Sequence, residues 1–307
     1  MEIFLTGGSG FIGHYVVKQL LSDGHRLRLL VRNTTKIPSL VTMPGVTVVE
    51  GTLGSRAVIG KALQGCEACV HIALGWGGTP TTMLQNDTAA TVFLLEAAEK
   101  AGVRKFIYTS STAAVGEFRP HMDETIDPRP TDLYGATKAA SEAFVLGFAA
   151  KTKMLSNVIR PGYTFGNPAF PDGVTQPDQR FNKIVACALK NEPITVTQHD
   201  GTQFIWAGDL AKVYSALLAS QLNRRVFFGL SDEFVTWEKV AQKAVEATGS
   251  KSPIVVEDKG WDPKPCLFDL GAIRREFGLS FTASSEIAKH VEYLATKLKM
   301  QPSQPPR

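Results

Sequence analysis

A glycine-rich turn between an apolar run and a helical pattern is the feature that most limits how this chain can fold. Residues 6–13 read Thr-Gly-Gly-Ser-Gly-Phe-Ile-Gly and directly follow the apolar residues 3–5. Gly7 allows a tight turn after a strand, Gly10 lets the backbone approach a pyrophosphate, and Gly13 lets the helix pack closely on the sheet. The order predicts a pyrophosphate at the positive end of a helix dipole, and hence a dinucleotide cofactor.

The residues after the turn strengthen this interpretation. Apolar side chains recur there with helical spacing, at Phe11, Ile12, Val16, Val17, Leu20 and Leu21. A strand before the glycines and a helix after them make the motif more specific than the glycines alone. Gly8 also completes a Gly-x-Gly-x-x-Gly frame, so two variants of the motif stay open.

Strand and helix patterns alternate over the first 160 residues. Apolar runs typical of strands lie at 2–6, 26–31, 46–50, 68–73, 104–109 and 154–159. Helical patterns lie at 11–23, 55–64, 81–101 and 132–151. The alternation predicts an α/β fold, a Rossmann-type doubly wound parallel sheet with right-handed crossovers.

The second half of the chain is less regular. Three prolines within 166–178 predict a loop. Beyond it we expect helices near 179–190, 209–220, 236–248 and 283–298, and strands near 194–197 and 225–229. We therefore expect a Rossmann domain over 1–165, to which parts of the later chain return, a smaller substrate-binding lobe over 166–300, and a disordered tail over 301–307.

Composition excludes several classes of protein. The net charge of +4, from 33 basic and 29 acidic residues in 307, is too mild for a nucleic-acid-binding protein. No apolar run is long enough to span a bilayer, and the strand at residues 1–6 leaves no room for a signal peptide, so we expect a cytoplasmic protein. Cys66 and Cys69 have no second ligand pair nearby, which favours buried thiols over a metal site or a disulfide.

The end of the second strand indicates which dinucleotide binds. An acidic residue there would accept hydrogen bonds from the ribose 2′-hydroxyl of NAD, whereas an arginine pairs with the 2′-phosphate of NADP. In this chain the strand ends at Arg32, and Asn33, Thr34 and Lys36 follow without an acidic residue. The pattern favours NADP over NAD.

Tyr134 and Lys138 carry the strongest chemical signal. Side chains four residues apart lie on one face of a helix. Tyrosine has an ordinary pKa of about 10, and a nearby ammonium favours the phenolate, so Lys138 would make Tyr134 a better acid or base near neutral pH. Hydroxyl groups at 109–112 follow the fifth strand, at the sheet edge where ligands bind, and one could hold a substrate carbonyl.

Together these motifs resemble the extended short-chain dehydrogenase/reductase family, which includes nucleotide-sugar epimerases, dehydratases and dihydroflavonol-reductase-like enzymes. The resemblance covers nearly the whole chain. The segments that carry it are 6–13, His71-Ile72-Ala73, Asn86-Asp87-Thr88 with 94–98, Thr109-Ser110-Ser111, Tyr134 with Lys138, 160–166, Gly208-Asp209-Leu210-Ala211, and 268–278.

The resemblance implies a catalytic triad of Ser111, Tyr134 and Lys138, with Ser110 as the alternative serine. It implies cofactor contacts at Gly7, Gly10, Phe11, Ile12, Gly13, Arg32, Lys36, Thr52, Leu53, Ala73, Leu74, Thr109, Tyr134, Lys138, Pro161, Gly162 and Tyr163. For the substrate we expect contacts from Trp76, Ser111, Thr112, Phe170 and Arg180. No metal is needed.

Departures from the family pattern bear on the substrate. Thr202 stands where many nucleotide-sugar enzymes of the family carry an arginine for the diphosphate, although Arg180 or Lys183 could replace it. Trp76, Phe170 and Phe181 favour a more apolar substrate site, unless they are core residues.

Three functions stay open at this point. The first is an NADP-preferring carbonyl reductase or alcohol dehydrogenase. The second is a nucleotide-sugar epimerase or dehydratase with a tightly bound cofactor, and the third is a non-catalytic NADP-sensing module. A small-molecule substrate is expected, and a homodimer is left open.

Overall fold

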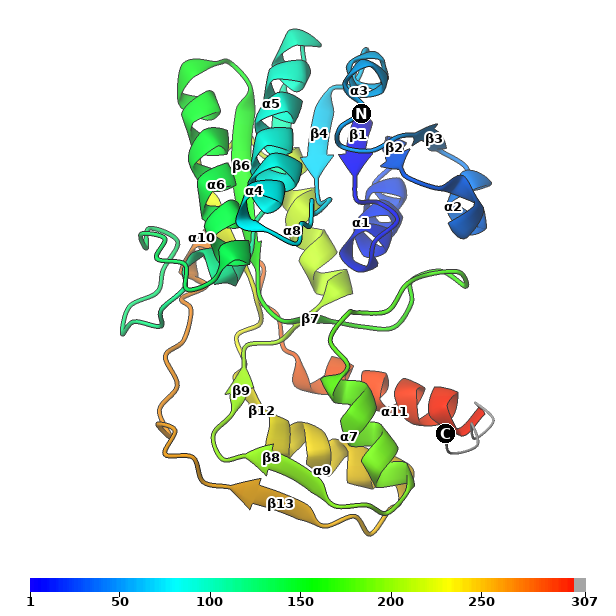
Figure 1. Cartoon of the computed structure of the whole chain (residues 1–307), viewed down its shortest axis with the longest axis vertical. Coiled ribbons are helices and arrows are strands. Elements are labelled where there is room, and N and C mark those ends of the chain that lie inside the picture. Colours follow the sequence, from blue (N-terminus) through cyan, green and yellow to red (C-terminus); the bar gives the residue numbers. More distant parts are fainter. Residues whose placement is uncertain (301–307) are drawn as a thin grey trace.

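A seven-stranded sheet forms the larger part of the computed structural model, which describes residues 1–300 (Figure 1). Its order is β11-β6-β5-β4-β1-β2-β3, and every neighbouring pair is parallel. The strands are β1 (Glu2–Thr6), β2 (Arg26–Val31), β3 (Val46–Glu50), β4 (Ala68–His71), β5 (Lys105–Thr109), β6 (Leu155–Pro161) and β11 (Val226–Gly229). The expected Rossmann-type fold is confirmed.

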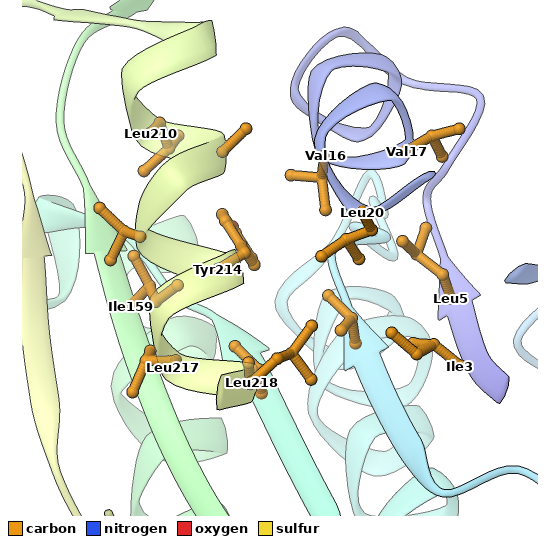
Figure 2. Packing of buried hydrophobic residues seen from close by; sticks show 14 of the residues in the cluster. Ile3, Leu5, Val16, Val17, Leu20, Ile159, Leu210, Tyr214, Leu217 and Leu218 are labelled. Carbon is orange, nitrogen blue, oxygen red and sulfur yellow. The ribbon is translucent and has the colours of Figure 1, made fainter. Parts of the chain in front are cut away.

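Alternate residues of each strand enter two separate apolar layers, as the two-residue period of a strand requires. Ile3 and Leu5 contribute to one layer, under α1 (Phe11–Ser22) and α8 (Ala207–Ala219), whereas Phe4 contributes to the other. Figure 2 shows side chains of α1 and α8 converging over the strands. The opposite face is covered by α3 (Arg56–Ala62), α5 (Ala90–Lys100) and α6 (Leu133–Lys151). This two-sided cover explains why the strands read as continuous apolar runs.

The helical pattern at 81–101 is not one helix. It contains α4 (Pro80–Met83), a π-helical segment η2 (Leu84–Ala89) and α5. Fully buried Asp87 lies in the π segment. Such wide turns are frequent at functional sites.

The fourth strand is two residues shorter than the expected 68–73. After β4 the chain turns toward the glycine-rich turn, where the amide of Ile72 donates to the carbonyl of Thr6 and the amide of Ala73 to its hydroxyl. The sixth strand starts one residue later and ends two residues later than the expected 154–159, at Pro161.

A second apolar core lies below the sheet in Figure 1. Three helices enclose it: α7 (Arg180–Leu189), α9 (Trp237–Thr248) and α11 (Ser284–Met300). The parallel pair β8 (Ile194–Thr197) and β13 (Ile254–Glu257) lies beside them.

The chain passes between the two cores repeatedly. Helix α8 and strand β11 belong to the sheet layer although they lie far beyond residue 165, and so does α10 (Gly271–Phe277). The remaining elements are short: η1 (Thr34–Lys36), α2 (Pro38–Val41), η3 (Thr112–Ala114), β7 (Thr164–Phe165), β9 (Gly201–Thr202), β10 (Ile205–Trp206) and β12 (Val235–Thr236). Within residues 1–300, no helix combines the length and apolarity that crossing a membrane requires. The tail at 301–307 lies outside the described residues.

Candidate active site

A cavity of about 910 Å³ runs along the carboxyl ends of the parallel strands. Most of the residues expected at the cofactor line it. They are Gly7, Gly10, Phe11, Ile12, Gly13, Arg32, Thr52, Leu53, Ala73, Leu74, Thr109, Tyr134, Lys138, Pro161 and Gly162. Ser111 and Trp76, expected at the substrate, line it too. Segments far apart in the sequence therefore meet at one edge of the sheet, where ligands of this architecture bind.

The glycine-rich turn has the geometry that a pyrophosphate requires. Gly7 has φ 78°, and a Cβ there would approach the amide of Ala73 to 2.5 Å. A Cβ on Gly13 would overlap the carbonyl oxygen of Gly7. Helix α1 begins after Gly10 without any side-chain cap, so its first N–H groups face the cavity without an internal acceptor. The residues present thus fit a dinucleotide.

The end of the cavity beside β2 is lined by Arg32, which follows that strand and is exposed. Arg56 also lines this end and lies 4.8 Å from the ring centre of Phe93. Arg56 was not among the predicted site residues, although it begins α3, the helix that follows the third strand. Lys36 lies in η1, outside the cavity lining.

Tyr134 lies in the first turn of α6, where Asp132 caps the helix by accepting from the amide of Gly135. Lys138 follows one turn later, and its Nζ is 5.8 Å from the ring centre of Tyr134. Burial raises the pKa of Tyr134, while the neighbouring hydroxyl of Ser111 acts in the opposite direction. Lys138 is expected to lower that pKa, but burial has the largest effect on it and raises it.

Lys138 is itself buried and paired. Its Nζ lies 3.5 Å from Oδ2 of Asp87, and both side chains are shielded from solvent. Burial lowers the pKa of Lys138, and Asp87 counteracts this effect. Asp87 was identified only as part of a helix motif, and its pairing with Lys138 was not predicted.

Both candidate serines line the cavity. Ser111 accepts a hydrogen bond from the amide of Ala113 at 3.1 Å and so caps η3. Ser110 is buried, and its Oγ has no hydrogen-bond partner among residues 1–300. The choice between the two serines stays a prediction.

A second hollow of about 410 Å³ adjoins the first at Ser111 and Gly162. Thr112, Tyr163 and Arg180 line this second hollow rather than the first. Tyr163, expected at the cofactor, thus lines the second hollow and not the first cavity.

Arg180 interacts with two other residues that line the second hollow. Its Nη1 lies 3.6 Å from Oδ2 of Asp200, and its guanidinium lies 4.5 Å from the ring centre of Trp237. Phe118, Phe268 and Thr202 complete much of the wall. The hollow is therefore aromatic, and its arginine is paired with a carboxylate.

Two aromatic residues lie elsewhere. Phe170 lines neither hollow, because it packs against His14 of α1 with the ring centres 5.2 Å apart. Phe181 is fully buried in the second core. By contrast, Trp76 is 63% exposed and its ring centre lies 6.3 Å from that of Tyr134.

The chain is similar to a known enzyme family and to several curated proteins. The model of the NAD dependent epimerase/dehydratase family matches residues 3–227. A 3-beta-hydroxysteroid dehydrogenase of Mycolicibacterium neoaurum is 33% identical over 178 residues, which cover 54% of this chain and 48% of that protein. A 4-hydroxy-2-methyl-3-oxo-4-farnesyl-3,4-dihydroquinoline-1-oxide ketoreductase of Stigmatella aurantiaca is 29% identical over 172 residues, covering 54% and 51%. The chain spans about half the length of these curated relatives.

Solved structures share the fold over nearly the whole chain. UDP-glucuronic acid 4-epimerase from Bacillus cereus, in complex with NAD, superposes with a TM-score of 0.81 at 21% identity. The match covers 97% of this chain and 99% of the epimerase. At this identity the likeness concerns the fold alone.

Proposed function

The chain belongs to the NAD dependent epimerase/dehydratase family, and from that premise we propose that it interconverts a ketone and a secondary alcohol with Tyr134 as the acid or base. When bound, a nicotinamide dinucleotide supplies or accepts the hydride. The observation that carries the proposal is that Tyr134, Lys138 and Ser111 line one cavity together with the glycine-rich turn. Tyr134 transfers a proton to or from the substrate oxygen, and Ser111 donates a hydrogen bond to that oxygen.

The test is Tyr134→Phe, which removes the phenol hydroxyl and keeps the ring. We expect turnover of ketones and alcohols to fall by about 10²–10⁴-fold, the usual contribution of an acid–base group. Binding of the dinucleotide, followed by thermal shift, should be retained. Ser111→Ala and Ser110→Ala form a matched pair, and the larger loss of turnover identifies the serine. Activity of Tyr134→Phe close to that of the unaltered protein would refute the assignment.

The proposed cofactor is NADP rather than NAD. Arg32 supports this preference because it is exposed at the end of β2 that lines the cavity. The nearest acidic residue along the neighbouring strand, Glu50, receives a 3.5 Å hydrogen bond from Thr34. A guanidinium in this place pairs well with a 2′-phosphate.

The proposed substrate is a weakly charged carbonyl or alcohol compound rather than a sugar diphosphate. The support is the second hollow, where Arg180 is paired with Asp200 and stacked on Trp237. A diphosphate there would meet the carboxylate of Asp200 as well as the arginine, and burying it without paired cations costs free energy. The steroid dehydrogenase and the ketoreductase among the relatives agree with this class of substrate.

Calorimetry with UDP and UDP-sugars on the cofactor-loaded protein tests this proposal. We expect no micromolar binding, while a panel of apolar ketones should raise the melting temperature. Micromolar binding of a UDP-sugar that is lost in Arg180→Ala would instead favour an epimerase or dehydratase.

Two further properties remain our proposals. Cys66 and Cys69 are unpaired buried thiols in the structure, which agrees with a reducing compartment such as the cytoplasm. A homodimer is tested by sedimentation of the purified protein.

A further inference from the structure

Asp87 places a fully buried carboxylate beside the lysine that serves Tyr134. Its Oδ1 accepts a hydrogen bond from the amide of Gly75 at 3.2 Å, and its Oδ2 lies 3.5 Å from Nζ of Lys138. Oδ2 has no hydrogen-bond partner within residues 1–300. Because a buried carboxylate is unfavourable unless it is paired, the ammonium of Lys138 is the group that compensates it.

The other groups around Lys138 add no net charge. Glu142, one turn further along α6, is held by two hydrogen bonds from Arg160 of β6, at 2.9 and 2.7 Å. From β5, the ring centre of Tyr108 lies 5.2 Å from Nζ of Lys138. From β4, His71 is neutral, because burial and then the charge of Lys138 lower its pKa to about 3.

The two buried ion pairs are therefore each balanced. Lys138 cancels Asp87, and Arg160 cancels Glu142. An ammonium whose charge is cancelled does little to stabilise a phenolate on Tyr134. Burial raises the pKa of Tyr134 most, the hydroxyl of Ser111 lowers it, and the charges of Asp87 and Asp132 raise it more weakly.

We propose that Asp87 is a positioning residue that holds and neutralises Lys138 in a buried ion pair and so sets the pH range over which Tyr134 exchanges its proton with the substrate. The inference rests on the proposed function. In the reduction, the carbonyl carbon receives the hydride that a reduced nicotinamide cofactor supplies. The carbonyl oxygen receives the phenol proton of Tyr134, and solvent water returns a proton to the phenolate. In the reverse reaction the phenolate of Tyr134 accepts the proton of the alcohol oxygen.

The decisive variant is Asp87→Asn, which removes the charge and keeps an oxygen for the amide of Gly75. We expect the apparent pKa of Tyr134 to fall by about one, at the lower end of the shifts that a neighbouring charge produces. In the pH–rate profile of alcohol oxidation, the rise on the acid side should move to lower pH by the same amount. At pH values below this rise, the rate of alcohol oxidation should increase by up to about tenfold, as the phenolate fraction does.

The controls separate charge from structure. Asp87→Glu restores a carboxylate and should restore the pH profile of the unaltered protein. Glu96→Gln, at an exposed position of α5, removes one charge of the same sign outside the site and should leave the profile unchanged. An apparent pKa that is unmoved or raised in Asp87→Asn would overturn the proposal.

A second measurement needs neither turnover nor a variant of Asp87. The protein, loaded with reduced dinucleotide and labelled in its tyrosine rings, is titrated by NMR, and Tyr134→Phe identifies the Tyr134 signal. We expect Tyr134 to remain a phenol beyond pH ~9, near or above the ordinary pKa of a tyrosine. A phenolate that forms below about pH 8 would overturn the proposal even if Asp87→Asn fails to fold. If these titrations behave as expected but no ketone or alcohol is turned over, the proposed function fails, and only the effect of the Asp87–Lys138 pair on the pKa of Tyr134 stands.

Discussion

The ion pair between Glu142 and Arg160 provides a quantitative test of how the catalytic helix is held. Both oxygens of Glu142 accept from the guanidinium, and the two side chains are only 2% and 3% exposed. Glu142→Gln keeps the shape but leaves a buried guanidinium without its counter-charge. Nη1 of Arg160 already lacks a hydrogen-bond partner in the described chain, so no other group is in place to compensate it.

Removing one partner of a buried pair costs about 3–5 kcal/mol in free energy of unfolding. We expect a loss of this size for Glu142→Gln. The control is Glu276→Gln, which breaks a pair with Arg225 whose side chains are 30% and 38% exposed. That loss should stay below about 1 kcal/mol, because solvent screens exposed pairs.

The assay is urea unfolding, followed by both circular dichroism and tryptophan fluorescence. Coincident transitions of the two probes would justify a two-state free energy of unfolding. An unchanged slope of that free energy against urea concentration would show that the native state is still compact. The double variant Glu142→Leu with Arg160→Met should recover most of the loss, since an apolar replacement of both partners removes the buried charge. A loss for Glu142→Gln no larger than that for Glu276→Gln would refute the reasoning.

Three further predictions follow from the structure. Arg32→Ala should weaken NADP binding by about 1.5–3 kcal/mol and leave NAD binding almost unchanged, and equal losses in calorimetry would contradict the assignment. Gly13→Ala should abolish dinucleotide binding, because its Cβ would overlap the carbonyl of Gly7, whereas Gly60→Ala, with open space around it in α3, should stabilise the chain by about 0.5–1 kcal/mol. Burial lowers the pKa of His290 to about 4, so the unfolded chain binds a proton between about pH 6.5 and 4 that the folded chain does not, and stability should fall over that range as the pH falls. His290→Gln should reduce this acid loss by up to about 3 kcal/mol, and an identical pH dependence of unfolding in the variant would contradict it.

The regular part of the fold was predictable because its signals are local. Each central strand is buried on both faces, so it appears in the sequence as an apolar run, and the glycines mark the one turn where backbone and helix approach closely. Tyr134 and Lys138 were predictable together because helical spacing alone places them on one face.

The parts that were missed depend on contacts between distant segments. Asp87 resembles any solvent-exposed polar residue of a helix until the π segment turns it toward Lys138. Phe170 and Phe181 are both aromatic and lie near the same loop, but only packing decides that one covers α1 and the other fills the second core. The two-residue strands β7, β9, β10 and β12 are too short to show any period.

The repeated passage of the chain between its two cores limits how such a protein can be remodelled. Helices α7, α9 and α11 enclose the second core, while α8 and α10, which alternate with them in sequence, pack on the sheet. A chain cut at residue 165 would lose β11 and α8, and with them the outer neighbour of β6 and the cover over one face of the sheet. The part of the chain that forms the second core therefore cannot be exchanged as one continuous segment. A chimera with new substrate preference must be spliced at several points, or built by replacing single side chains that line the hollow.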